Sequence, residues 1–185
     1  MHTEYEVRIL EIDVPKMRNK LEELGAKKRG TYFQKRYVYE FNPHIEGKFI
    51  RLRTNGEKTT LTIKHHYDRQ KIGGTSELET EVEDFDTMHK ILQELGYKPQ
   101  CYQENKRETY DLNGVEIDLD TWPRIPTFME IEAQDKETVL AYADKLEVTS
   151  YPMTTEDAKH VYLKYGIDLD AIDNLTFEEE KHETI

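Results

Sequence analysis

Charged and apolar residues alternate along six short stretches of the chain. In the first stretch, Glu4, Glu6 and Arg8 alternate with Val7 and Ile9. Because alternate residues of a β-strand point to the same face, each stretch predicts a strand with one charged and one apolar face. The charged or polar positions of the other five stretches are Arg51, Arg53, Thr62, Lys64, Glu77, Glu79, Glu81, Asp118, Asp120, Glu130 and Glu132. If helices cover the apolar faces, the charged faces line a shared interior or a broad open surface.

Four segments have the periodicity of amphipathic helices. They are predicted over residues 13–25, 86–96, 135–146 and 155–166. Asp13, Asp86, Asp135 and Thr155 are the expected starting residues, because their side chains can accept hydrogen bonds from the first turn. These stripes are expected to face the core.

The chain also contains an approximate internal repeat. The recurring pairs are Leu21/Leu92, Glu23/Glu94, Leu24/Leu95, Gly25/Gly96, Lys27/Lys98, Lys35/Lys106, Arg36/Arg107, Tyr39/Tyr110 and Asn42/Asn113, all 71 positions apart. Each half is predicted to contain a charged strand, a helix and further strands, a βαββ-like unit. The expected fold class is therefore α+β, with an antiparallel barrel or tunnel of about eight strands, two pseudo-repeated halves and helices packed outside.

Composition narrows the classes of function. Hydrophobic residues make up 36% and charged residues 35% of the chain, and the formal charge is −12. This acidic balance argues against general nucleic-acid binding, which needs a basic surface. One cysteine, Cys101, excludes an intramolecular disulfide, and no stretch has the length of a membrane span. We expect a cytoplasmic protein with no membrane partner, a single domain over residues 1–175 and an acidic, frayed tail at 176–185.

The ordered charged motifs resemble the CYTH superfamily, the triphosphate tunnel metalloenzymes. The motifs are Glu4-x-Glu6-x-Arg8, Arg51-x-Arg53, Thr62-Ile-Lys64, Glu79-x-Glu81, Asn105-Lys-Arg107 and Asp120…Glu130-Ile-Glu132. No single triplet is specific, but the ordered set covers roughly residues 1–165. The resemblance implies a charged tunnel that binds a triphosphate with Mg²⁺ or Mn²⁺.

The resemblance also implies roles for individual residues. The candidate catalytic residues are Glu4, Glu6 and Arg8. Candidate triphosphate-binding residues are Arg8, Arg51, Arg53, Lys64 and Arg107, because guanidinium groups bind phosphate oxygens in pairs. Candidate metal ligands are the hard oxygen donors Glu4, Glu6, Asp120, Glu130 and Glu132. Glu79 and Glu81 are expected to hold basic side chains in position. Asp118 shares the same strand face but falls outside the family's motif.

Three departures from the family pattern stand out. Arg8 and Asn105 occupy positions where the family carries lysine, and Lys106 is expected to point outward. The usual Leu-Gly-x-Phe before the last acidic pair is replaced by residues 122–128, Trp-Pro-Arg-Ile-Pro-Thr-Phe. This replacement is interpreted as a subfamily feature.

Four functions remain open at this level. The favoured one is hydrolysis of an inorganic or organic triphosphate, such as tripolyphosphate, thiamine triphosphate or ATP. A class IV adenylyl cyclase would use similar charged walls to form cyclic AMP and pyrophosphate from ATP. A non-catalytic polyphosphate or nucleotide binder and a plain barrel scaffold are the other two. A homodimer is a further expectation.

Overall fold

The computed structural model describes residues 1–178 of the chain. The predicted tail at 176–185 lies outside the described residues from position 179 onward. The strands are β1 His2–Ile9, β2 Lys27–Glu40, β3 Lys48–Thr54, β4 Thr59–His66, β5 Thr75–Val82, β6 Pro99–Leu112, β7 Val115–Thr121, β8 Phe128–Ala133, β9 Met153–Thr154 and β10 Asn174–Leu175. The helices are α1 Val14–Glu23, α2 Phe85–Glu94, α3 Lys136–Lys145, α4 Ala158–Lys164 and the short 3₁₀ helix η1 Leu169–Ala171.

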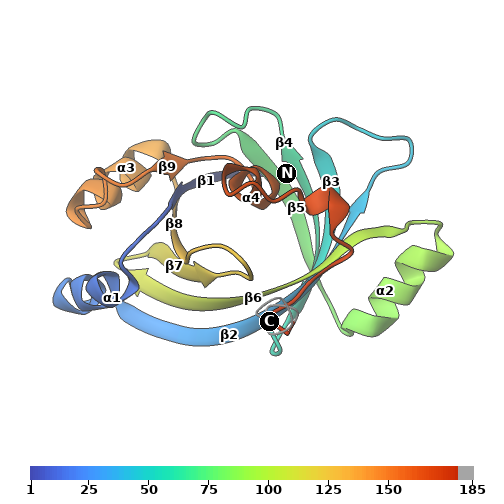
Figure 1. The fold of residues 1–185 in the computed structure, drawn as a ribbon, viewed down its shortest axis with the longest axis horizontal. Helices are drawn as coiled ribbons and strands as arrows, with labels where there is room; N and C mark the ends of the chain where they lie inside the picture. Colours follow the sequence, from blue (N-terminus) through green and yellow to red (C-terminus); the bar gives the residue numbers. More distant parts are fainter. Residues whose placement is uncertain (179–185) are drawn as a thin grey trace.

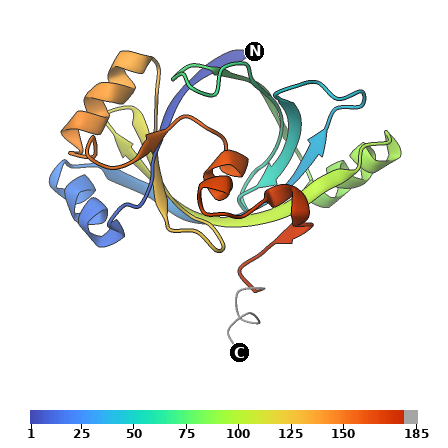
Figure 2. The same ribbon diagram turned by 45° about the horizontal axis from the view of Figure 1, so that its top comes forward.

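The first eight strands form a closed barrel (Figures 1 and 2). They are hydrogen-bonded in the order β6-β2-β3-β4-β5-β1-β8-β7, and β7 pairs back with β6 to close the ring. Every pair in this ring is antiparallel, which confirms the predicted eight-stranded antiparallel barrel. The short strands β9 and β10 attach to β1 and β6.

The two predicted halves have the same order of elements. Residues 2–66 give β1-α1-β2-β3-β4, and residues 75–133 give β5-α2-β6-β7-β8. Each half is therefore a βαβββ unit, one strand longer than predicted. The last strand of each half is needed because the barrel closes only when both β4 and β8 pair on both sides.

Helices α1, α2 and α3 cover the outer surface of the barrel (Figure 1). Leu21 of α1 and Val139 of α3 are fully buried in one cluster with outward-facing residues of β1, β7 and β8 such as Ile117. Leu92 of α2 packs with Leu52 in a second cluster. Burying these apolar strand faces stabilises the barrel and leaves its charged faces inside.

The fourth helix differs from the prediction that all helices lie outside. Helix α4 and η1 lie across one mouth of the barrel (Figure 2). Val161 and Tyr162 of α4 pack in a third cluster with Trp122 and Phe128, which line the barrel interior. The apolar residues at this end of the interior give α4 a surface to bury, so it covers a mouth instead of the outer wall.

Two helices also begin at residues other than those predicted. The N-cap of α2 is Asp84, whose Oδ1 accepts a 2.7 Å hydrogen bond from the Thr87 backbone N–H, so Asp86 lies in the first turn. The N-cap of α4 is Asp157, since the hydroxyl of Thr155 donates instead to the carbonyl oxygen of Arg69 at 2.6 Å. None of the described helices could cross a membrane.

Candidate functional site

The barrel encloses a cavity of about 680 Å³. Ten of the sequence-predicted site residues line it: Glu4, Glu6, Arg8, Arg51, Arg53, Lys64, Glu79, Arg107, Glu130 and Glu132. Asp120 is fully buried in the wall behind them. Glu81 is not part of the lining, because it forms an exposed 2.6 Å ion pair with Lys58. Lys106 is exposed, as its position on the opposite strand face predicted.

Arginines gather on one wall of this cavity, on β2, β3 and β6. Arg36 and Arg53 face each other across β2 and β3, and Arg51 and Arg107 lie close enough to act on their charge. The charge of Arg51, burial and the charge of Arg107 lower the pKa of Arg53 to about 10. Like charges directly opposite each other destabilise a sheet. The wall therefore carries an excess of positive charge that an anion in the cavity would compensate.

Carboxylates partly neutralise the basic residues nearer to β4. Lys64 Nζ is 2.7 Å from Glu4 Oε1, and Arg51 Nη2 is 3.4 Å from Glu79 Oε2. Glu77 lies between them, 3.6 Å from Lys64 and 3.9 Å from Arg51. Glu79 also accepts a 2.6 Å hydrogen bond from the hydroxyl of Thr62. These carboxylates hold the two cations in the wall.

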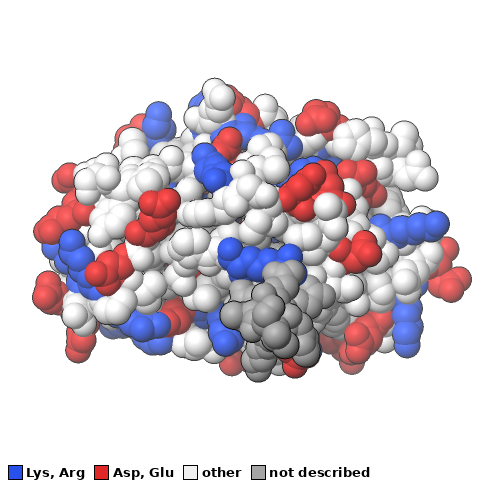
Figure 3. All heavy atoms as spheres, in the orientation of Figure 1, with Lys and Arg blue, Asp and Glu red and all other residues white. Residues whose placement is uncertain are grey.

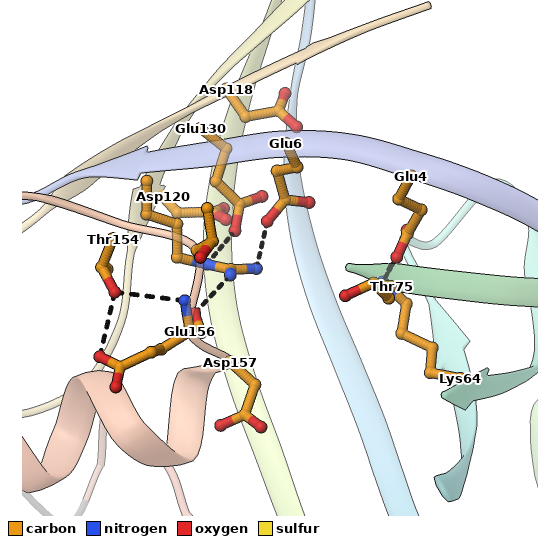
Figure 4. A network of polar contacts seen from close by, with 12 residues as sticks. Glu4, Glu6, Lys64, Thr75, Asp118, Asp120, Glu130, Thr154, Glu156 and Asp157 are labelled. Carbon is orange, nitrogen blue, oxygen red and sulfur yellow. Dashed lines mark hydrogen bonds and ion pairs between the residues drawn. The ribbon is translucent and has the colours of Figure 1, made fainter. Parts of the chain in front are cut away.

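A denser network joins β1, β6, β7 and β8 (Figure 4). Arg107 Nη1 is 2.7 Å from Asp118 Oδ2, and Arg107 Nε donates a 2.9 Å hydrogen bond to Asp120 Oδ1. Glu130 accepts a hydrogen bond from Arg107 and forms an ion pair with Arg8, whose Nε is 2.8 Å away. Burial alone would raise the pKa of Glu130, but Arg8 and Arg107 hold it far below its usual range. Asp120 and Glu130 are therefore already engaged by guanidinium groups.

Three further carboxylates form a row whose negative charge is less well neutralised by basic side chains. Glu132 on β8 is directly opposite Glu6 on β1 and Glu116 on β7, and all three line the cavity. Burial, followed by the charges of Glu6 and Glu4, raises the pKa of Glu132 to about 8. Burial also raises the pKa of Glu6, although Arg8 Nη2 lies 2.5 Å away. The row concentrates negative charge that a cation would relieve.

This row has the donor chemistry of a Mg²⁺ or Mn²⁺ site. Within residues 1–178, no three Asp, Glu, His or Cys side chains converge on one point as a preformed metal centre. Mg²⁺ does not need such a centre, because it is usually held by one or two carboxylates, water and substrate phosphates. Glu6 and Glu132, supported by Glu4 and Glu116, fit that mode of binding.

The geometry agrees with a comparison against protein families, in which the CYTH domain model matches residues 2–161. The chain belongs to the CYTH family. Its members are typically triphosphate tunnel enzymes that use divalent metals. No curated protein sequence matches the chain significantly.

Solved structures share the CYTH fold. The PH1012 protein of Pyrococcus horikoshii is 27% identical, with a TM-score of 0.70, over 80% of this chain and 92% of its own. A putative adenylate cyclase from Vibrio parahaemolyticus is 13% identical, with a TM-score of 0.72, over 88% and 98%. The Hippeastrum protein HpAC1, described as a putative adenylyl cyclase with a dominant triphosphatase activity, is 14% identical, with a TM-score of 0.57, over 91% and 99%.

Some residues of the CYTH cavity were missing from the sequence-predicted site. Arg36 was missed, although the internal repeat places it at the position equivalent to Arg107. Asp118, a buried ion-pair partner of Arg107 that is not itself part of the lining, was left out because it lies outside the family motif, yet strand alternation already put it on the inner face. Asp157, which accepts a 3.2 Å hydrogen bond from Arg69 Nε at the mouth covered by α4, gave no signal in the sequence.

Proposed function

We propose that this CYTH protein is a metal-dependent enzyme that hydrolyses a triphosphate inside the barrel. The observation that carries the proposal is the division of one cavity into two charged walls. Arg36 on β2 and Arg53 on β3 have no ion-pair partner among the described residues, and a row of carboxylates lies on β1, β8 and β7. A triphosphate supplies the negative charge that the arginine wall lacks, and its divalent cation supplies the positive charge that the carboxylate wall lacks.

The arginines would bind the phosphate chain. Arg51, Arg53 and Arg107 present planar groups that donate paired hydrogen bonds to phosphate oxygens. In hydrolysis, a water oxygen bonds to the terminal phosphorus, the bridging P–O bond breaks, and negative charge moves onto the departing diphosphate. Arginines fixed beforehand in the wall stabilise this charge without having to reorganise.

The carboxylate row would hold the metal. Glu6 and Glu132 are the proposed ligands, and Glu4, Asp120 and Glu130 keep Lys64, Arg107 and Arg8 in place. A bound Mg²⁺ or Mn²⁺ would shield phosphate charge and lower the pKa of a coordinated water. Arg8 is held by Glu6, Glu130 and a 2.6 Å hydrogen bond to the carbonyl oxygen of Glu156, so it connects this wall to the covered mouth.

The surface agrees with a small-molecule substrate. On the described part of the face shown in Figure 3, Lys and Arg are interspersed with Asp and Glu and form no continuous basic area. The basic groups gather instead inside the barrel, where a nucleic-acid duplex cannot reach them.

Product analysis tests the proposal. The protein is incubated with tripolyphosphate, thiamine triphosphate or ATP, each with Mg²⁺ or Mn²⁺. Orthophosphate release supports hydrolysis. Formation of cyclic AMP and pyrophosphate from ATP would instead make the protein an adenylyl cyclase, and tight binding without turnover would make it a polyphosphate binder.

A further inference from the structure

Arg36 is a buried cation whose hydrogen-bond partners are all neutral. It is 7% exposed and lines the cavity. Its Nη2 donates to Gln34 Oε1 at 2.9 Å and to Asn105 Oδ1, while its Nε has no hydrogen-bond partner. Among the described residues, no carboxylate lies within ion-pair distance of Arg36. Arg107 and Arg51, by contrast, each have at least two such carboxylates.

A buried charge without a counter-charge is costly to the folded protein. The cost is larger here because Arg53 lies directly opposite, and burial followed by the charges of Arg53, Arg51 and Arg107 lowers the pKa of Arg36 well below its usual value. Two neutral hydrogen-bond acceptors, the ring of Trp122 and the more distant charge of Asp120 offset only part of this cost. An anion in the cavity would offset it.

Asn105 connects Arg36 on β2 to Asp120 on β7. Asn105 occupies the position where the CYTH pattern has lysine, and it is fully buried. Its Oδ1 accepts from Arg36, and its Nδ2 donates a 3.0 Å hydrogen bond to Asp120 Oδ1. A lysine at this position would set a second cation against the guanidinium of Arg36. The neutral amide instead accepts from Arg36 and fixes the place of its side chain.

Trp122 supports Arg36 from another side. It belongs to the 122–128 segment that replaces the family's Leu-Gly-x-Phe. The guanidinium carbon of Arg36 lies 4.5 Å from the centre of the indole ring, within the range of a cation–π interaction. Trp122 is itself buried, with Tyr162 of α4 packed against its ring. The two departures from the family pattern therefore meet at the same side chain.

We propose that Arg36 binds a phosphate group of the polyphosphate and replaces the charge of the family's lysine, with Asn105 and Trp122 as the residues that position it. The proposal rests on the proposed function and adds a phosphate-binding residue to it. In this proposal the phosphate-binding side chain is an arginine on β2 and not a lysine on the neighbouring strand β6. Its guanidinium offers a planar pair of donors where lysine offers a point charge.

The first test compares Arg36→Met with wild type, using tripolyphosphate as the probe. Calorimetry measures its affinity, and thermal melts with and without it measure the stabilisation by binding. Loss of a charge-assisted contact should weaken binding about 10- to 150-fold. The melting temperature of the apo protein should stay equal or rise, because an uncompensated buried charge is gone. A lower apo melting temperature with unchanged tripolyphosphate affinity would show a structural role and overturn the proposal.

Lys106→Met is the matched control, since Lys106 is exposed and adjacent in sequence to Asn105. It removes the same charge from the protein and should leave tripolyphosphate affinity within about twofold. An equal loss in both variants would mean that net charge alone governs binding, which would contradict a specific role of Arg36.

A rescue tests the replacement of one cation by another. In the Arg36→Met background, Asn105→Lys returns the family's lysine to β6 and should bind tripolyphosphate more tightly than Arg36→Met alone. Asn105→Lys alone should lower the apo melting temperature, because two cations then meet without an anion. A double variant that binds no better than Arg36→Met would contradict the inference that Arg36 on β2 replaces the charge of the family's lysine on β6.

Trp122→Leu tests positioning through a double-mutant cycle. It should weaken tripolyphosphate binding when Arg36 is present and cause no further loss when residue 36 is Met. Equal losses in both backgrounds would remove Trp122 from this role. If wild type binds none of tripolyphosphate, thiamine triphosphate and ATP, the proposed function fails; if wild type binds tripolyphosphate and Arg36→Met binds it equally well, only this inference fails.

Discussion

Glu6 and Glu132 lie directly opposite each other on strands β1 and β8, and both line the cavity. Two carboxylates in this arrangement repel, and Glu116 extends the row on β7. Glu130, two residues before Glu132 on β8, lies instead between Arg8 and Arg107. Neighbouring carboxylates of one sequence motif thus have opposite electrostatic surroundings, and they should respond differently to the same substitution.

Glu132→Gln should stabilise the metal-free protein at alkaline pH. The folded pKa of Glu132, about 8, lies above the unfolded value of about 4.3. The protonated carboxyl therefore favours folding below pH 4.3, and this contribution is lost as pH rises through 8. Urea unfolding at several pH values checks this. The advantage of the Gln variant should grow between about pH 4 and pH 8, and a constant difference would contradict it.

Glu130→Gln should destabilise the protein, in contrast to Glu132→Gln. The substitution removes one carboxylate partner from each of Arg8 and Arg107, which leaves Arg8 with Glu6 and Arg107 with Asp118 and Asp120. Breaking a buried pair from one side costs about 3–5 kcal/mol when the other charge is left alone, so the loss here should be smaller than that. Chemical denaturation of both variants at pH 7 without metal gives the comparison. Equal stability of the two would show that the Arg8–Glu130–Arg107 contacts contribute nothing.

Arg53→Ala should weaken polyphosphate binding without loss of apo stability. Among the described residues Arg53 has no ion-pair partner, and Arg51 and Arg107 repel it. The affinity for tripolyphosphate should fall about 10- to 150-fold, which is the loss of one charge-assisted hydrogen bond. Thermal melts with and without tripolyphosphate measure it, with Lys106→Ala as the control. Equal stabilisation of wild type and Arg53→Ala by tripolyphosphate would remove Arg53 from the site.

Asp157→Asn should cost about 2–3 kcal/mol at pH 7. Burial opposes ionisation of Asp157, but hydrogen bonds from the His160 side chain and backbone, with the charge of His66, lower its pKa to about 2. The ionised form thus stabilises the fold above the unfolded pKa of about 3.9, and this contribution is lost as pH falls through 2. Asn retains the N-cap at Oδ1, so the substitution tests the charge together with the Arg69 hydrogen bond at Oδ2.

Asp84→Asn on α2 is the matched control for Asp157→Asn. Asp84 is also an N-cap, but it is exposed on the surface. Its substitution should change the free energy of unfolding far less. Denaturation curves at pH 7 and pH 3 compare the two variants. A penalty for Asp157→Asn that does not shrink at pH 3 would contradict the electrostatic origin.

Strand alternation predicted the inner face of the barrel well, for a simple physical reason. A closed sheet has only two faces, so a strand that places Val7 and Ile9 in the helix-covered core must place Glu6 and Arg8 inside. The same rule separated outward Lys106 from inward Arg107. The helix pattern likewise gave α1 and α3 with their N-caps Asp13 and Asp135.

Pairing across strands could not be predicted in the same way. The sequence gives no register, so it could not show that Glu130 meets Arg8 and Arg107 while Glu132 meets Glu6. It could not show that Glu81 turns to Lys58 at the surface. The position of α4 was also hidden, because its apolar stripe fits the mouth of a barrel as well as its outer wall.

The equivalent strands of the two halves carry opposite charges. Arg51 and Arg53 are the fourth and sixth residues of β3, while Asp118 and Asp120 are the fourth and sixth residues of β7. In its electrostatics the chain resembles a heterodimer whose two subunits were joined end to end. On these two equivalent strands one half presents guanidinium groups and the other presents carboxylates, so a half expressed alone would lack the counter-charge of this strand pair. Binding of a phosphate anion together with its metal cation therefore needs both halves of the barrel.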